Sequence, residues 1–392
     1  MADPGLEELR SDLARTDEEI RLAVSRRLAI ARAIGEAKRR AGLPVRDFAA
    51  EKGVLDRWRN DLSSEEVPPE RAEALARWLI EEAVRVQEQG RVERSPPTSH
   101  ASDVLIVGGA GEMGGWMREF FRASGHRVGI VDPRADRHRA EGYTVHPDLA
   151  RAAQDADVIV VATPMRVAPS VYRELLKTES EGVIFDILSI KQPILPWVRR
   201  GIHSGLHLTS VHPLFGPSAR TLSGRNLLVV ECGDPRADLR AHHLFGASSL
   251  TITHVPIDHH DLLMAETLAL PHIVALLFGE VLAASPRAPR ELWHAAPTSF
   301  LRQLESTQVI ASESPELSFD IQHLNPASEA LFERLEKTLQ AMRKAVREGD
   351  SATYHRQMDE ARAWVERVRP SAGGSAPAHR GTTGDGPGAR AS

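Results

Sequence analysis

The sequence predicts three folded parts in order: an all-helical part, an α/β part built on a parallel sheet, and a second helical part. Residues 6 to about 89 lack strand signals and are rich in Ala, Leu, Glu and Arg. Residues 103 to about 250 alternate short apolar strands with helices, which indicates a parallel sheet. From about residue 257 the apolar pattern is helical again, with helices expected near 258–284, 290–312 and 326–349. A chain of 392 residues has room for two or three such domains.

Composition narrows the class of protein. The net charge of −5 argues against a general nucleic-acid binder. The single cysteine, Cys232, allows no internal disulfide and points to a reducing compartment. The acidic N-terminus has no apolar signal core, and no uninterrupted apolar run approaches the length of a membrane span. We therefore expect a cytoplasmic enzyme that binds neither nucleic acid nor membranes.

The first part begins with one long amphipathic helix that ends near Ala41, before Gly42 and Pro44. Its apolar stripe recurs at steps of three and four residues: Leu6, Leu9, Leu13, Ile20, Val24, Leu28, Ala31 and Ile34. Such a helix is roughly 50 Å long. Two shorter helices, near 47–62 and 68–89, cannot cover that stripe alone. We therefore expect a homodimer in which long helices from two chains pack together.

The α/β part opens with a nucleotide-binding pattern. An apolar run from Val104 to Val107 precedes Gly109, Gly111 and Gly114, which have the spacing G-x-G-x-x-G. We expect Gly109 to make the tight turn, Gly111 to admit a pyrophosphate, and Gly114 to let helix and strand pack closely. A second apolar run ends at Asp132, where a carboxylate can bond both ribose hydroxyls and repel a 2′-phosphate. The pattern predicts a Rossmann domain that binds NAD rather than NADP.

Other residues should line the same edge of the sheet. Glu112 and Met113 lie inside the glycine motif, and Thr163 and Pro164 follow the predicted strand 158–162; we expect all four at the cofactor. His212 directly follows the predicted strand 208–211, at the strand end where α/β folds place reacting groups. Histidine is suited to accept a proton near neutral pH. Further strands are expected at 183–187 and 227–230.

Two cations on the long helix share one face. Arg27 and Lys38 are eleven residues apart, about 16 Å along the axis, and could hold a small dianion between them. Surface cations whose stems cover apolar area would show the same spacing. The stretch from Leu6 to Asp47, however, resembles the all-helical chorismate mutase family over nearly the whole first domain. The residues that match the family pattern are Arg10, Arg27, Lys38, Asp47, Glu51 and Gln87.

The resemblance implies a role for each matched residue. Two arginines would grip the two carboxylates of chorismate, with Arg10 reaching into the partner's site. Lys38 and Gln87 would stabilise charge on the breaking ether oxygen, and Glu51 would hold the ring hydroxyl. The rearrangement is intramolecular and needs no metal, because positioning and electrostatics suffice. Two departures are visible: Ala50 stands where an Arg is usual, and Ala83 where a small hydroxyl is common.

The segments DILSIKQP (186–193) and SVHPLFGPSA (210–219) resemble prephenate dehydrogenases, and the resemblance extends over about 103–350. It implies that His212 accepts the proton of the ring hydroxyl at the carbon that loses hydride. It also implies that Ser189 orients His212 and approaches the nicotinamide of NAD. His260 and His272, twelve residues apart on one predicted helix, match two family histidines near the substrate. His259 is expected to be solvated.

The main departure concerns the carboxylate on the ring. The family's arginine for it falls near Val309 in this chain, and the candidates to replace it are Arg302 and, less directly, Arg290. Three explanations are open. Arg302 takes the place of the family's arginine, or that arginine matches another position because the chain has an insertion or deletion, or the substrate carries an amino group in place of the ring hydroxyl.

The sequence thus predicts five segments: a chorismate mutase-like domain (1–91), a linker (92–102), a Rossmann domain (103–254), a helical substrate and dimerisation domain (255–369) and a disordered tail (370–392). We expect conversion of chorismate to prephenate and then to 4-hydroxyphenylpyruvate with NAD. Alternatives are the same reactions on 4-amino-4-deoxy analogues, a dehydrogenase whose N-terminal helices only dimerise or regulate, and, more remotely, a 3-hydroxyacid-type dehydrogenase.

Overall fold

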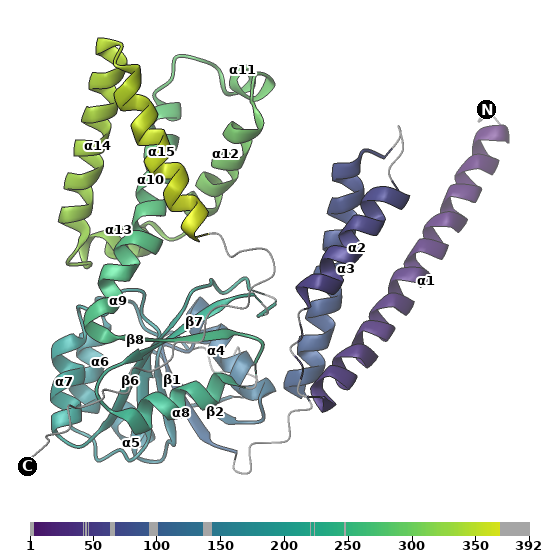
Figure 1. Ribbon diagram of the computed structural model, residues 1–392. Coiled ribbons are helices and arrows are strands. Elements are labelled where there is room, and N and C mark those ends of the chain that lie inside the picture. Colours follow the sequence, from purple (N-terminus) through teal and green to yellow (C-terminus); the bar gives the residue numbers. More distant parts are fainter. Residues whose placement is uncertain are drawn as a thin grey trace, which may run out of the picture. The chain divides into compact units, whose positions relative to one another are not determined.

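The structure is a computed structural model, and it describes residues 4–41, 43, 45, 47–62, 67–93, 101–135, 143–219, 221, 222, 224–246 and 248–368. It divides into two compact units, one up to Ser328 and one from Glu329. Figure 1 gives the element labels used below. The predicted tail and most of the predicted linker lie outside the described residues.

Three helices form the N-terminal part, as predicted: α1 (Pro4–Arg40), α2 (Phe48–Asp61) and α3 (Pro69–Glu93). Asp47 caps α2, because its carboxylate accepts a hydrogen bond from the backbone N–H of Ala50. A small core cluster of Val45, Ile80 and Val84 joins the segment before α2 to α3. Helix α3 also packs along the C-terminal half of α1.

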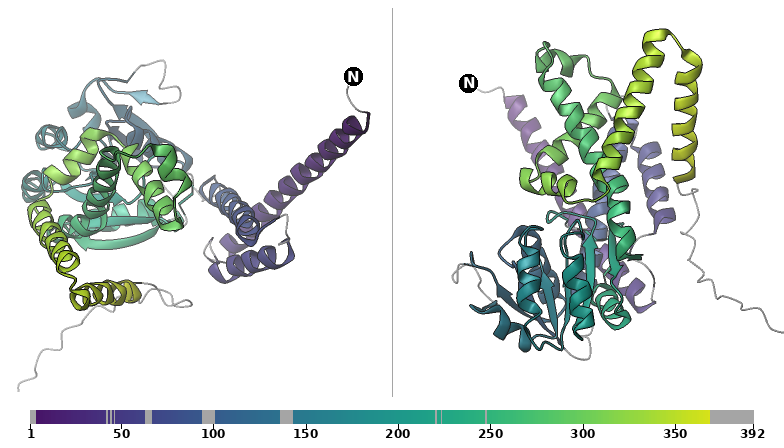
Figure 2. Two further views of the ribbon diagram at one scale, coloured as in Figure 1. Left: turned by 90° about the horizontal axis from the view of Figure 1, so that it is seen from above. Right: turned by 90° about the vertical axis from the view of Figure 1, so that its left-hand side faces the viewer.

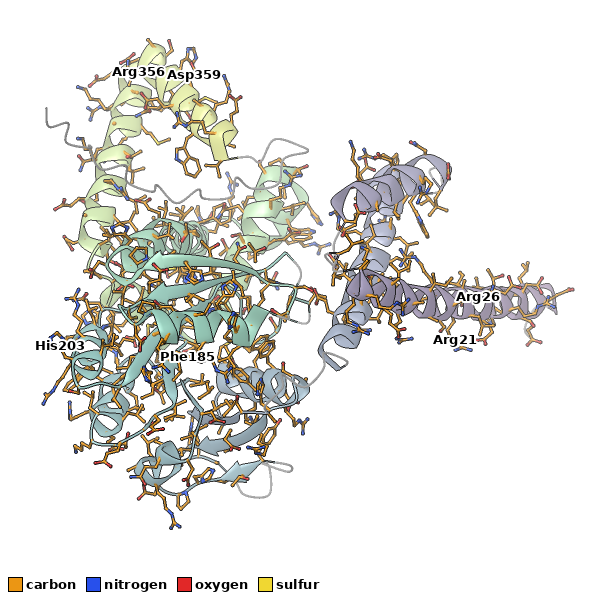
Figure 3. All side chains as sticks on the ribbon, turned by 60° about the horizontal axis from the view of Figure 1, so that its bottom comes forward. Arg21, Arg26, Phe185, His203, Arg356 and Asp359 are labelled. Atoms are coloured by element: carbon orange, nitrogen blue, oxygen red, sulfur yellow. The ribbon has the colours of Figure 1, made fainter. Side chains whose placement is uncertain are left out.

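Most of the apolar stripe of α1 is exposed. The helix has 37 residues, about 55 Å, and its only buried apolar residue is Ala31. In the left-hand view of Figure 2 its N-terminal end runs clear of α2 and α3, and in Figure 3 Arg21 and Arg26 project from it. The exposed apolar residues are Leu6, Leu9, Leu13, Ile20, Leu22, Ile30 and Ile34. An exposed apolar surface of this size is typical of an interaction site.

The α/β part has one sheet of eight strands in the order β3-β2-β1-β4-β5-β6-β7-β8. The strands are β1 (Asp103–Val107), β2 (Arg127–Val131), β3 (Thr144–Val145), β4 (Val158–Val161), β5 (Val183–Asp186), β6 (His207–Pro213), β7 (Asn226–Glu231) and β8 (Thr251–Pro256). The prediction of a wholly parallel sheet was wrong at one place, because β7 pairs antiparallel with β6. The connection from β6 to β7 carries no helix to cross the sheet, so the chain returns beside β6 in the opposite direction.

Helices cover both faces of this sheet. On one face α4 (Glu112–Ala123) and α8 (Pro235–Gly246) meet through Phe120 and Phe245, whose rings stack at 5.2 Å. On the other lie α5 (Leu149–Gln154), α6 (Ala168–Leu175) and α7 (Leu195–His203). The central strands are buried on both sides, and Phe185 of β5 lies deep within them (Figure 3). This is the Rossmann arrangement that the alternating pattern predicts.

The helical segment after the sheet is broken by a π-helical turn. The sequence predicts one helix near 258–284, but the structure has α9 (Ile257–Met264), a π-helix (Ala265–Ala269) and α10 (Leu270–Ala283). A π turn adds a residue to the turn, so the faces before and after it are offset. The side-chain amide of Gln322 donates to the carbonyl of Ala269 at 3.1 Å. Helices α11 (Pro289–His294), α12 (Thr298–Ala311) and α13 (Pro315–His323) follow.

By length and composition alone, residues 257–283 would also pass as a membrane span. The segment nevertheless carries three buried polar side chains, His260, Asp261 and His272, each with a polar partner. A folded domain can bury ionisable side chains when each has a polar partner, whereas placing such side chains in a lipid bilayer costs free energy.

Helices α14 (Ser328–Glu348) and α15 (Ser351–Val368) make up the second compact unit. The division at 328/329 falls inside the stretch 255–369 that the sequence predicts as one domain. The sequence pattern did not indicate α15.

Candidate active sites

The carboxyl ends of five neighbouring strands bring the predicted dehydrogenase residues to one edge of the sheet. Asp132 follows β2, the glycine loop follows β1, Thr163 follows β4, Ser189 follows β5, and His212 lies at the end of β6. Strands are about 4.8 Å apart, so this row from β2 to β6 extends about 19 Å. The strand order reverses between β1 and β4, which is where such folds bind dinucleotides.

The glycine loop has room for backbone contact with a ligand, but its turn lies one residue earlier than expected. The left-handed residue is Gly108, with φ of +89°, and not Gly109. A Cβ on Gly114 would lie 2.2 Å from the carbonyl oxygen of Gly108, so only glycine lets α4 start this close to the turn. At Gly111 the nearest atom would be 3.3 Å away, and the position is the N-cap of α4. The N-terminus of α4 therefore faces an approachable loop, as phosphate binding requires.

The carboxylate of Asp132 is buried and holds the glycine loop. It accepts hydrogen bonds from the backbone N–H of Ala110 at 3.0 Å and of Arg134 at 2.8 Å. Each carboxylate oxygen has a second lone pair, so acceptor capacity remains for ribose hydroxyls. Of the other predicted cofactor residues, Glu112 begins α4 exposed, and Met113 packs against the core. Pro164 is exposed, and the hydroxyl of Thr163 is buried without a partner.

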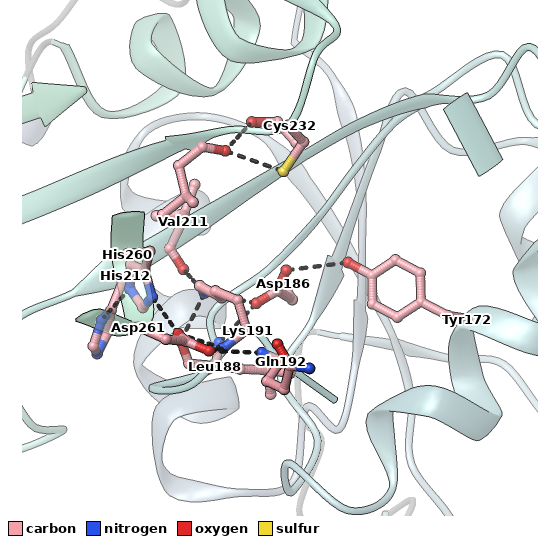
Figure 4. A network of polar contacts seen from close by, with 12 residues as sticks. Tyr172, Asp186, Leu188, Lys191, Gln192, Val211, His212, Cys232, His260 and Asp261 are labelled. Carbon is pink, nitrogen blue, oxygen red and sulfur yellow. Dashed lines mark hydrogen bonds and ion pairs between the residues drawn. The ribbon is translucent and has the colours of Figure 1, made fainter. Parts of the chain in front are cut away.

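Beneath His212 lies a buried cation that the sequence reasoning did not single out (Figure 4). The ammonium group of Lys191 is 2.8 Å from the carboxylate of Asp186 and donates to the carbonyls of Leu188 at 2.6 Å and Val211 at 2.9 Å. Both charged side chains are essentially inaccessible to water. The only signal was their place in the segment 186–193, at the end of a fully apolar strand, where a charge must be paired.

His212 is buried and contacts a second histidine. Its Nδ1 lies 3.0 Å from Nε2 of His260, and Nδ1 of His260 lies 2.7 Å from the carboxylate of Asp261 (Figure 4). Burial, and then the cation of Lys191, hold the pKa of His212 well below its usual value of 6.5. Burial also lowers the pKa of His260, against the effect of Asp261. Both rings are therefore neutral at neutral pH, and a neutral imidazole can accept a proton.

Two sequence expectations change here. Ser189 was expected to orient His212, but the hydrogen-bond partner of the ring is His260, and among the described residues Ser189 forms no hydrogen bond with His212. His260 was expected at the substrate, yet it is completely buried with both ring nitrogens engaged. The pairing could not be predicted from spacing, because the two histidines are 48 residues apart and meet only when α9 packs on the sheet.

His272 lies past the π turn, in a different setting. Its Nε2 is 3.8 Å from the carboxylate of Glu313, and its Nδ1 is buried without a hydrogen-bond partner. Val309 is exposed on α12, one turn before Glu313. Arg302 is also exposed and lies nine residues before the end of α12, about 14 Å along the axis from the end beside Glu313. Within one protomer Arg302 is thus remote from His272, and Arg290 is exposed on α11.

In the N-terminal part, three predicted residues make contacts between α1 and the rest of the domain. Arg27 donates to the carbonyl of Leu79, and Lys38 donates to the carbonyl of Val45 at 2.7 Å. Gln87 is buried with its side-chain oxygen unpaired. A Cβ on Gly35 would lie 2.8 Å from the side chain of Gln87, so this glycine sets the close approach. A buried acceptor without a partner is unusual and suits a polar ligand.

The remaining predicted residues of this part lie around it. Asp47 is occupied as the cap of α2, and Glu51 is half-buried in its first turn. Arg10 is exposed on the uncovered half of α1. Ala50 is exposed in the first turn of α2, and Ala83 is half-buried on α3. Arg27, Lys38 and Gln87 thus lie on the half of α1, and on the helix α3, that pack together, whereas Arg10 lies on the uncovered half of α1.

Comparison with known proteins accounts for both groups of residues. Residues 9–88 match the family described as chorismate mutase type II. Residues 120–230 match the prephenate dehydrogenase nucleotide-binding domain, and residues 256–360 the prephenate dehydrogenase dimerization domain. A 4-amino-4-deoxyprephenate dehydrogenase of Streptomyces pristinaespiralis is 30% identical over 259 residues, which cover 64% of this chain and 86% of that protein. The chain belongs to the prephenate dehydrogenase family, with a chorismate mutase domain at its N-terminus.

Two further relatives bear on the domain arrangement of this family member. The T-protein of Enterobacter agglomerans is 24% identical over 359 residues, covering 91% of this chain and 92% of that protein, so it shares all three domains. The crystal structure of the Aquifex aeolicus prephenate dehydrogenase, in complex with hydroxyphenyl propionate and NAD+, has the same fold in the dehydrogenase part. Its TM-score is 0.56 at 18% identity, covering 69% of this chain and 99% of that one.

Proposed function

We propose that the chain is a bifunctional enzyme that rearranges chorismate to prephenate and then oxidatively decarboxylates prephenate to 4-hydroxyphenylpyruvate with NAD, in tyrosine biosynthesis. One observation carries the proposal: a mutase-type domain and a prephenate dehydrogenase-type part occur in one chain, and the product of the first reaction is the substrate of the second. The geometry of each site supports its half of the chemistry.

In the mutase domain the substrate needs positioning and charge stabilisation, but no covalent partner. Arg27 and Lys38 supply two cations on one face of α1, and Gln87 of α3 has a buried, unpaired side-chain oxygen and packs against Gly35. We propose that Arg27 binds a carboxylate, that Lys38 and Gln87 stabilise the ether oxygen, and that Glu51 binds the ring hydroxyl. Arg10, exposed on the free half of α1, would reach the site of the partner subunit.

In the dehydrogenase part, the edge of the sheet fits a dinucleotide. The N-terminus of α4 and the glycine loop would hold the pyrophosphate, and Asp132 would hold the ribose of NAD. Bound NAD would supply the hydride acceptor. His212 would take the proton of the ring hydroxyl as hydride leaves the same carbon, and loss of CO₂ makes the ring aromatic. Ser189, one strand away from His212, would face the nicotinamide, and His272 the substrate.

We also propose a homodimer in the cytoplasm. Exposed apolar side chains on α10, namely Val274, Leu276, Leu277 and Val281, lie within the stretch that matches the dimerization domain. A second copy would cover them and the apolar half of α1.

Separate inactivation of the two sites tests the proposal. The purified full-length chain should convert chorismate to prephenate and form NADH from prephenate. Arg27→Ala should abolish mutase activity and leave NADH formation from prephenate within about twofold, whereas His212→Asn should do the reverse, cutting hydride transfer by about 100-fold or more. Absence of chorismate turnover by the unaltered chain would leave only a dehydrogenase, with the helical domain as a dimerisation or regulatory module.

A second candidate function is favoured by the relative of highest identity among those described. That Streptomyces protein is named for a substrate with a 4-amino group. This chain also lacks two charged residues that the family patterns lead one to expect, at Ala50 and Val309. The alternative reactions convert 4-amino-4-deoxychorismate to 4-aminophenylpyruvate. Comparing kcat/KM for NADH formation with prephenate and with its 4-amino analogue decides between them, and a preference of tenfold or more for the amine would replace the first proposal.

A further inference from the structure

The carboxylate of Asp261 is surrounded by hydrogen-bond donors. It accepts from the backbone N–H of Lys191 at 2.9 Å and of Gln192 at 2.8 Å, and its third contact is Nδ1 of His260 at 2.7 Å (Figure 4). A carboxylate has no hydrogen to donate and can only accept. The hydrogen in the third contact must therefore sit on Nδ1 of His260.

This one proton fixes the next contact. His260 is completely buried, and a neutral imidazole carries a single proton. With that proton on Nδ1, Nε2 of His260 is an acceptor, so Nδ1 of His212, 3.0 Å away, must be the donor. The remaining nitrogen of His212, Nε2, is then unprotonated. It forms no hydrogen bond with any described residue, and it is the atom that can take a proton.

We propose that His260 and Asp261 are positioning residues that hold His212 in the tautomer with a bare Nε2, the form that accepts the substrate's proton. The inference rests on the proposed dehydrogenase function. Asp261 accepts hydrogen bonds from the backbone of the segment that contains Ser189 and Lys191. The packing of α9 on the sheet therefore also sets the tautomer of His212. Their spacing along the sequence does not link these two residues with His212.

The charged groups around the pair favour neutral rings. Lys191 lies beside both histidines, and its cation opposes a second positive charge there, while Asp186 is engaged by Lys191 itself. Asp261 is the only carboxylate in hydrogen-bond contact with either ring among the described residues. A proton taken by His212 during the reaction would thus be held only weakly and passed on readily.

A purely structural role for Asp261 must be separated from this one. Asp261 joins α9 to the sheet, and Asn325 donates to its backbone carbonyl at 2.9 Å. The decisive readout is therefore the protonation of the ring nitrogens of His212. Long-range ¹H–¹⁵N NMR of the histidine-labelled full-length protein, without cofactor, distinguishes a protonated from a bare ring nitrogen. The signal of His212 is assigned by its loss in His212→Asn.

The substitution Asp261→Asn inverts the chain of donors. The backbone N–H of Gln192 donates to Oδ2 at 2.8 Å, and that of Lys191 reaches the same oxygen at 3.2 Å, so the amide oxygen takes this place. The amide NH₂ then takes the place of Oδ1, faces His260 and turns its Nδ1 into an acceptor. His260 would then donate from Nε2, and His212 would carry its proton on Nε2. We expect that shift in the spectrum and a fall in kcat of about 100-fold or more, with KM changed less than about threefold.

The substitution His260→Gln provides a matched rescue, because its side-chain oxygen can accept from His212 Nδ1, whereas His260→Leu cannot. We expect His260→Gln to keep the tautomer and kcat within about tenfold, His260→Leu to lose both, and His259→Gln, at an exposed neighbour on α9, to match the unaltered protein. If Asp261→Asn does not fold, the Gln and Leu pair decides. An unchanged tautomer or kcat in Asp261→Asn, or equal losses in Gln and Leu, would overturn the inference. Failure of every substrate to yield NADH would instead sink the proposed function, since the NMR result does not depend on turnover.

Discussion

Replacing Lys191 by Met removes a buried cation and leaves its partners in place. The ammonium group serves three acceptors: the carboxylate of Asp186 and the carbonyls of Leu188 and Val211. Methionine has a similar length and fills the space without a donor. After the substitution, Asp186 keeps only the hydroxyl of Tyr172 at 3.2 Å and the backbone N–H of Leu188 at 3.0 Å.

The expected destabilisation is about 3–5 kcal/mol, the usual cost of leaving one member of a buried ion pair unpaired. The two carbonyls that lose a donor place the effect toward the upper end. Asp186→Asn in the same chain removes the stranded charge, because a neutral amide is far less costly to bury. The double variant Asp186→Asn, Lys191→Met should therefore recover at least about half of the loss, which corresponds to a strong coupling between the two positions.

Denaturant unfolding of the full-length chain measures this, with the transition of the dehydrogenase part followed separately from that of the helical domain, because the chain is not a single cooperative unit. Lys177→Met, at an exposed lysine on the loop after α6, is the matched control and should stay within about 0.5 kcal/mol. A midpoint for Lys191→Met equal to that of the unaltered protein, or a double variant less stable than Lys191→Met, would refute the reasoning.

Three further predictions concern the cofactor and the base. Gly114→Ala should weaken NAD binding measured by fluorescence titration by about tenfold or more, since its Cβ would lie 2.2 Å from the carbonyl oxygen of Gly108. Gly115→Ala, which meets only the end of a flexible arginine, should bind normally, and equal affinities would contradict the packing argument. Asp132→Asn should raise KM for NAD and allow measurable activity with NADP; unchanged selectivity would exclude Asp132 as the discriminating group. Because the pKa of His212 lies well below 6.5, the decline of kcat/KM on the acid side of the pH profile should occur only below pH 6.5. In the unfolded chain this histidine takes up a proton near pH 6.5, so the folded state should lose stability as the pH falls below that value. A decline of kcat/KM that begins above pH 6.5 would count against His212 as the base.

Much of the dehydrogenase site could be predicted because its residues belong to short sequence motifs. The glycine spacing, the acid after β2 and His212 after β6 all lie at strand ends, and parallel strands bring those ends to one edge. The turn was placed one residue late, since G-x-G-x-x-G spacing does not tell which glycine near the strand end adopts positive φ. The antiparallel β7 escaped because an apolar run has no direction.

In the mutase domain, periodicity fixed the helices, but the contacts depended on how they pack. Arg27 and Lys38 share a face by spacing alone, whereas the burial of Gln87 against Gly35 follows from α1 meeting α3. The uncovered stripe of α1, expected from the length of the helix, is present in the structure.

The sequence by itself determined the order of the domains, the glycine loop at the edge of the sheet and the position of the candidate base His212, because these depend on periodicity and on residues adjacent in the chain. Only the tertiary structure decided what surrounds that base. Lys191 and Asp186 come from one segment and His260 and Asp261 from another, and their roles depend on distances of about 3 Å that exist only once α9 lies on the sheet. The interaction energies of hydrogen bonds and buried ion pairs depend on such short distances that the spacing of residues along the chain cannot predict them.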